Sequence, residues 1–115
     1  MGNIKLIARF LIHEGKEEEF KSIATQCLNI VSEKEKDTTL QYDWYFNSGG
    51  NECVVLETYA DSNAIFLHLG NLGELLGQLL QIADFYPEIY GSPSEELLSA
   101  VKAMNPKIYS FYQGV

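Results

Sequence analysis

Residues 4–12 alternate between apolar and mixed positions with a period of two, which predicts a β-strand. One face of this strand is wholly apolar and is formed by Ile4, Leu6, Ala8, Phe10 and Ile12. The other face combines Lys5, Arg9 and His13 with Ile7 and Leu11. The first face therefore belongs against a core. The second is too apolar for open solvent and too charged for a second core, so we expect it to be partly covered.

A helical period follows the break at residues 13–15. Residues 16–19 place three glutamates where the helix dipole favours negative charge. The apolar stripe of this helix is predicted to contain Phe20, Ile23, Cys27 and either Ile30 or Val31. The charged run at 33–37 ends the helix, and we expect it to be exposed to solvent.

Residues 40–46 and 53–59 predict a β-hairpin around the turn cluster at 47–51. A one-residue slip in register would exchange the two faces of a strand. The register that best separates apolar from polar positions pairs Trp44 with Val54, which places Glu57 on the mixed face beside Arg9. We therefore expect Glu57 to form a structural ion pair with Arg9, or with Lys5, with a catalytic base as the alternative role of the carboxylate.

The C-terminal half predicts two helical stretches (64–69 and 72 to about 84), a short strand at 87–91, a helix after the capping sequence at 92–95, and a strand at 108–112. Gly70, Gly73 and Gly77 match no phosphate-binding pattern, so we expect a kink or close packing there. The order of elements predicts an α+β, ferredoxin-like fold, with helices on one face of an antiparallel sheet. A second copy of the chain is the simplest cover for the other face.

Length and charge restrict the class of protein. The 115 residues predict one domain, with a core at about 3–91 and an extension at about 92–115. Sixteen acidic and eight basic side chains give a net charge of −8, which argues against nucleic-acid and anionic membrane partners. No signal peptide or membrane span is predicted, and the isolated Cys27 and Cys53 favour a reduced, cytoplasmic protein, although a disulfide between them stays open.

His68 is the strongest candidate for chemistry. It follows Ala64 by one helical turn, on the side that should face the sheet, where it could exchange a proton with a bound hydroxyl near neutral pH. A hydrogen-bonded core histidine is the alternative. Tyr42 and Trp44 have polar tips that need partners when buried, whereas Phe10 fits a plain aromatic core as well as a pocket wall. The spacing of histidines and cysteines predicts no metal site.

Several of these segments together resemble the antibiotic biosynthesis monooxygenase (ABM) domain family, which includes quinol monooxygenases of the dimeric α/β-barrel superfamily. The resemblance covers about residues 3–83. It is carried by residues 8–10, 15–20 and 40–44, by the strand end at 57–59, and by Asp61, Ala64 and His68.

The resemblance implies a homodimer, a dimeric α/β barrel, with a cofactor-free pocket between sheet and helices. It also implies oxidation of a small aromatic or quinol-like substrate by dioxygen, with His68 as the base and Tyr42, Trp44, Phe10 and Phe66 at the substrate. Haem is not expected, because the haem-ligating His of haem-degrading relatives falls at Leu76. A non-catalytic small-molecule-binding or dimerisation module of the same fold is the alternative.

Overall fold

The computed structural model describes residues 2–115. In chain order its elements are β1 (Ile4–Ile12), α1 (Glu17–Lys34), β2 (Thr39–Phe46), β3 (Glu52–Tyr59), α2 (Ser62–Ile82), β4 (Ala83–Tyr90), α3 (Glu95–Ala100), the short 3₁₀ helix η1 (Lys102–Met104) and β5 (Lys107–Tyr109). The strands form one sheet in the order β2-β3-β1-β4-β5. All pairings are antiparallel except that of β4 with β5, which is parallel.

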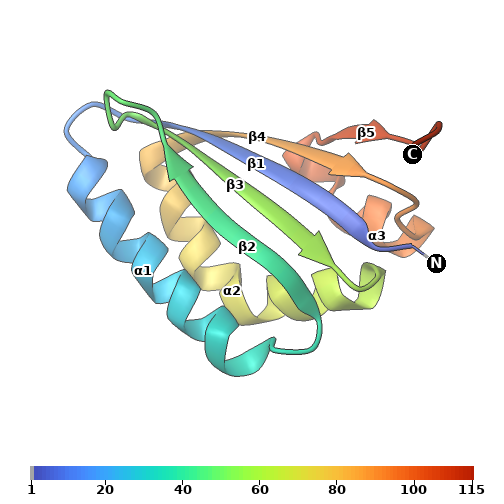
Figure 1. Cartoon of the computed structure of the whole chain (residues 1–115). Coiled ribbons are helices and arrows are strands. Elements are labelled where there is room, and N and C mark those ends of the chain that lie inside the picture. The colour runs from blue at the N-terminus through green and yellow to red at the C-terminus, as the bar shows by residue number, and fades with distance from the viewer. Residues whose placement is uncertain (1) are drawn as a thin grey trace.

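Helices α1 and α2 lie side by side across one face of this sheet (Figure 1). The predicted α+β, ferredoxin-like arrangement of a mostly antiparallel sheet with helices on one face is therefore confirmed. The helix starts follow their sequence signals, because Glu17, Glu18 and Glu19 occupy the first turn of α1 and Asp61 caps α2 by accepting a hydrogen bond from Ala64 N at 2.9 Å.

The core between sheet and helices has two parts. The larger lies mainly under α1 and α2, where the Phe10 and Phe20 rings meet edge to face with centroids 5.3 Å apart. The smaller joins the other end of the sheet to α3, whose Leu97 is fully buried beside Tyr59. The C-terminal extension thus packs onto the same sheet as the rest of the chain and supplies part of its core.

The predicted hairpin register is wrong by one residue. Trp44 lies opposite Val55, and Tyr42 lies opposite Glu57. A bulge between Thr39 and Gln41 shifts the start of β2. Cys53, Val55, Glu57 and Tyr59 therefore face the helices. The prediction chose the register that keeps charged residues off the apolar face, and it failed because Glu57 lies inside the protein.

Helix α2 is continuous from Ser62 to Ile82, where two helical stretches were predicted. The predicted close packing of its glycines is also wrong, since a Cβ added at Gly70, Gly73 or Gly77 would have no neighbour within 4 Å among the described residues. The apolar side of α2 packs on the sheet without help from these glycines. None of the helices described for residues 2–115 has the length and apolarity needed to span a membrane.

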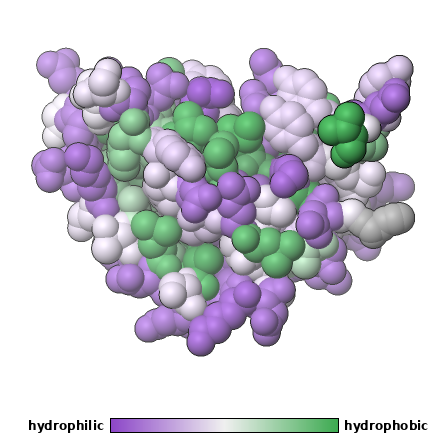
Figure 2. Space-filling model, viewed as in Figure 1, coloured by the Kyte–Doolittle hydropathy of each residue, from purple (hydrophilic) through white to green (hydrophobic). Residues whose placement is uncertain are grey.

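The sheet face opposite the helices has the mixed character predicted for it. It carries the exposed apolar side chains Leu11, Tyr45 and Tyr86 beside charged residues such as Arg9. In the view of Figure 2 the hydrophobic groups are separated by hydrophilic ones over much of the surface.

Candidate active site

A largely apolar cavity lies between the sheet and α2. Its walls come from β1, β2, β3 and β4, from α1 and α2, and from the C-terminal residues Val101, Met104 and Pro106. Its volume is about 80 Å³. Typical ligand pockets measure roughly 300–1,000 Å³, and an engineered apolar cavity of roughly 150 Å³ holds benzene. An aromatic ligand would therefore have to displace part of the wall.

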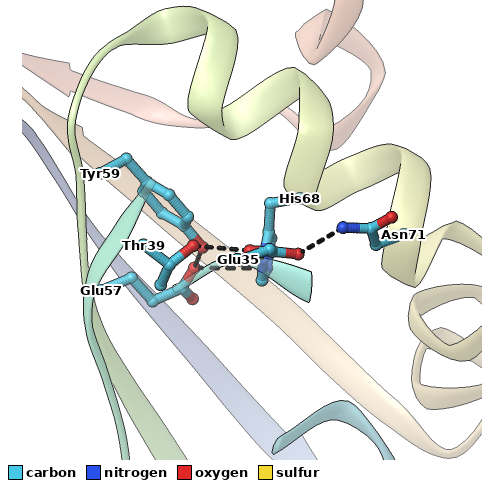
Figure 3. Close-up of polar contacts among 6 residues, drawn as sticks. All are labelled: Glu35, Thr39, Glu57, Tyr59, His68 and Asn71. Carbon is cyan, nitrogen blue, oxygen red and sulfur yellow. Dashed lines mark hydrogen bonds and ion pairs between the residues drawn. The ribbon is translucent and has the colours of Figure 1, made fainter. Parts of the chain in front are cut away.

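His68 and Glu57 are two of the ionisable residues in this lining. Figure 3 shows that His68 comes from α2 and that Glu57 and Tyr59 come from the strand beneath it. The imidazole is buried, and the Tyr42 and Tyr59 rings meet it edge-on, each with its centroid 5.1 Å from that of His68. Aromatic contacts on two sides fix the plane of the histidine ring.

Glu35 forms a hydrogen bond with one ring nitrogen of His68, Nδ1. Its Oε1 atom lies 2.9 Å from His68 Nδ1 and accepts a hydrogen bond from Thr39 at 2.6 Å, while Oε2 accepts one from Asn71 at 3.0 Å. Burial alone would raise the pKa of Glu35, but the hydrogen bonds from His68, Thr39 and Asn71 lower it to about 2. An ionised carboxylate only accepts, so Nδ1 carries a proton and donates it to Glu35.

Glu57 lies beside the second nitrogen of His68. Its Oε1 atom is 3.8 Å from His68 Nε2, and it accepts a hydrogen bond from the hydroxyl of Tyr59. Burial raises the pKa of Glu57 to about 7, against the lowering effects of His68 and the Tyr59 hydrogen bond. The same burial, together with the charge of Glu57, raises the pKa of Tyr59. Near neutral pH this carboxyl group can therefore either hold or release a proton.

The structure brings most of the predicted site residues together. Phe10, Tyr42, Trp44 and His68 all line the cavity. The indole nitrogen of Trp44 is buried and has no hydrogen-bond partner among residues 2–115. Phe66 is misplaced in the prediction, because it is 37% exposed on the outer side of α2 and lines a separate hollow near the N-termini of α2 and α3.

The predicted Arg9–Glu57 ion pair is also wrong. Arg9 lies on the opposite face of the sheet from Glu57 and pairs with Glu52, with 3.3 Å between Nη1 and Oε2. The one-residue error in register accounts for this, since β-strand side chains alternate between faces.

Cys27 also lines the cavity and lies close to Tyr42. Burial raises the pKa of the Cys27 thiol to about 11, and burial together with the charge of Glu57 raises the pKa of the Tyr42 hydroxyl. Both groups are therefore neutral near pH 7. Both cysteines are free and buried.

The sequence-based prediction missed Glu35, which it assigned to an exposed charged run. Glu35 ends α1 as its C-cap, and its carbonyl accepts hydrogen bonds from Thr38 and Thr39 in the following turn. Its side chain is completely buried, unlike those of Glu33 and Lys34. The apolar stripe of α1 contained the signal, because Glu35 follows the buried Val31 by four residues.

Among residues 2–115, no group of three or more histidine, cysteine, aspartate or glutamate side chains is arranged to hold a metal ion. The ionisable groups at the cavity are suited instead to moving protons between a bound molecule and the protein.

Comparison with known proteins gives matches in structure but not in sequence. No protein-family profile matches the chain, and no curated protein is significantly similar to it. MupZ from Pseudomonas fluorescens superposes with a TM-score of 0.86 at 23% identity, covering 100% of this chain and 94% of MupZ. SnoaB, a cofactor-independent oxygenase from Streptomyces nogalater, superposes with a TM-score of 0.67 at 14% identity, over 82% of this chain and 96% of SnoaB.

A third solved structure, named only as an antibiotic biosynthesis monooxygenase, has a TM-score of 0.63 at 15% identity, over 75% of this chain and 92% of its own. The chain has the ABM fold. The resemblance drawn from residues 3–83 is thereby confirmed at the level of structure. In this ABM fold the cavity lies between the sheet and the helices, where the resemblance predicted a pocket.

Proposed function

We propose that the protein is a cofactor-independent monooxygenase that oxidises a small aromatic or quinol-like substrate with dioxygen. The observation that carries this proposal is the placement of His68 at a largely apolar cavity, with Glu35 bound to Nδ1. The fold supports it as well, since one of the similar structures is a cofactor-independent oxygenase. Trp44 also lines the cavity, and its indole N–H, which has no hydrogen-bond partner among residues 2–115, is a candidate donor to a substrate oxygen.

In this reaction His68 Nε2 removes a proton from an electron-rich phenol or activated methylene group. The resulting substrate anion passes its electrons to dioxygen. One oxygen atom then enters the substrate and the other leaves as water, so that a methylene group becomes a carbonyl group. The reducing electrons come from the substrate itself. The protein supplies the base, an apolar site that shields the anion, and orientation.

Oxygen consumption with a panel of hydroquinones and anthrone-like phenols tests this function. We expect uptake above background in wild type and a loss of about 10²-fold or more in His68→Ala, because a positioned general base contributes that much. His13→Ala is the matched control, since His13 is exposed and pairs with Asp84 at 3.0 Å away from the cavity. Equal background rates in all three proteins would reject the monooxygenase.

The small volume of the cavity favours a second candidate, a non-catalytic binding or dimerisation module. In that case the same ligands would bind without oxygen uptake. Binding measured by calorimetry alongside the oxygen assay separates the two functions.

We further propose that the protein is a homodimer that joins through the sheet face opposite the helices. The exposed apolar side chains on this face support the proposal, and so does the alternation of charge between Arg9 and its acidic neighbours Glu52 and Asp84. A second copy rotated by two-fold symmetry would cover the apolar groups and oppose unlike charges.

Light scattering at micromolar concentration should give twice the 13.0 kDa mass of the chain. Leu11→Glu should shift the protein toward the monomer, because it buries a charge in the proposed interface. Leu28→Glu is the matched control, since both leucines are 39% exposed but Leu28 lies on α1. A monomeric wild type, or equal masses for both variants, would contradict the proposed interface.

A further inference from the structure

His68 and Glu57 place two groups that can carry a proton beside each other at the cavity. His68 Nδ1 donates to the ionised Glu35, so Nε2 is the ring nitrogen left to act as a base. Glu57 Oε1 lies 3.8 Å from Nε2, where a protonated carboxyl group is the matching acid.

This separation is longer than a hydrogen bond, so the two groups do not satisfy each other directly. The atoms of a bound molecule can therefore engage Nε2 and Oε1 separately. Both residues line the same cavity, whose other ionisable lining groups, Tyr42 and Cys27, are neutral near pH 7. Tyr59 donates to Glu57 and keeps its carboxyl group oriented.

We propose that His68 and Glu57 act together as a general base and a general acid, and that the site catalyses the oxygen-independent tautomerisation of small apolar ketones to their enols. This activity rests on the proposed function, because it uses the same cavity and the same base. It differs in needing no oxidant. Glu35 is the positioning residue that keeps Nε2 of His68 free.

Each atom in this step is accounted for. His68 Nε2 takes the proton from the carbon next to the carbonyl, and the electron pair of that C–H bond becomes the carbon–carbon double bond. The carbonyl π pair moves to oxygen, which takes the proton of Glu57. The enzyme is left with a protonated imidazole and a carboxylate. The proton then returns from Nε2 to Glu57 and restores the starting arrangement.

Deuterium exchange in D₂O under nitrogen tests the proposal, with cyclopentanone and 2-indanone as probes followed by proton NMR. We expect wild type to exchange the α-hydrogens about 10²-fold faster than buffer. Glu57→Gln and His68→Gln should return the rate to near that of buffer. Glu57→Gln keeps the size of the side chain and an acceptor for Tyr59, and His68→Gln keeps a donor toward Glu35. His13→Ala should behave as wild type.

The outcomes separate this activity from the monooxygenase. Exchange under nitrogen that is lost in both glutamine variants supports the acid–base pair, whatever the oxygen assay gives. If wild type takes up oxygen with hydroquinones but exchanges ketone α-hydrogens only at the buffer rate, the tautomerase proposal is rejected. The monooxygenase proposal is then retained. Exchange that survives in Glu57→Gln overturns the assignment of Glu57 as the acid. If wild type shows neither exchange above the buffer rate nor oxygen uptake, both activities are rejected.

Discussion

Replacing Glu35 with alanine should lower the free energy of unfolding by about 3–5 kcal/mol at pH 7, the range measured when one partner of a buried charged pair is removed. The substitution leaves three buried or half-buried donors, on His68, Thr39 and Asn71, without their acceptor. Urea unfolding measures the loss. Glu33→Ala is the control from the same charged run, and because Glu33 is exposed, its effect should stay within about 0.5 kcal/mol.

The stabilisation from Glu35 should also depend on pH. The pKa of Glu35 falls from the usual 4.5 to about 2 on folding, so the unfolded chain binds the extra proton between these values. Stability is therefore gained above pH 4.5 and lost as the pH falls toward 2. The difference between wild type and Glu35→Ala should shrink over that range. A constant difference, or a loss below 1 kcal/mol at pH 7, would contradict the burial and charge of this carboxylate.

The change in the free energy of unfolding caused by Glu57→Gln should have the opposite sign, so that this variant is more stable than wild type at pH 8. The pKa of Glu57 rises from 4.5 to about 7 on folding, so the folded state binds the extra proton between these values. Wild-type stability then falls as the pH rises from 4.5 to 7, by an amount on the order of 3 kcal/mol. Glutamine lacks this cost, so we expect Glu57→Gln to gain about 1–3 kcal/mol at pH 8 and to match wild type near pH 4.5.

Urea unfolding across pH 4.5–8 measures this difference. Glu52→Gln is the control on the same strand, because Glu52 is partly exposed and faces away from the cavity. Its unfolding curve should run parallel to that of wild type. If the Glu57→Gln curve were also parallel, Glu57 would not be a buried carboxyl group with a raised pKa.

Much of the fold could be predicted from the sequence because local patterns dominate it. The period-two alternation of β1 and the helical stripe of α1 each bury one continuous apolar side, and such patterns are read directly from residue order. Their order along the chain then restricts how they can pack. His68, Trp44 and Tyr42 were found in the same way, since each stands on the apolar side of its element.

The burial of Glu35 and Glu57 at the site was not predicted, because the prediction assumed that charged side chains lie at the surface. The register chosen to separate polarity put Glu57 on the outer face, and the charged run at 33–37 suggested that Glu35 is exposed. Both carboxyl groups instead lie inside the protein and flank one histidine. Each buried carboxyl group has one hydrogen-bond partner close to it in sequence, Thr39 for Glu35 and Tyr59 for Glu57. Glu35 is also bound by His68 and Asn71 from the distant helix α2. No spacing along the chain encodes the meeting of the C-cap of α1 with the middle of α2.

The position of Trp44 gives the protein a built-in optical probe. The chain contains one tryptophan, and its indole ring forms part of the cavity wall. All tryptophan fluorescence therefore comes from this wall. A molecule that enters and accepts a hydrogen bond from Nε1 changes the polarity around the fluorophore, whereas one that binds at the outer sheet face does not touch it. The emission spectrum thus reports where a ligand binds without any label.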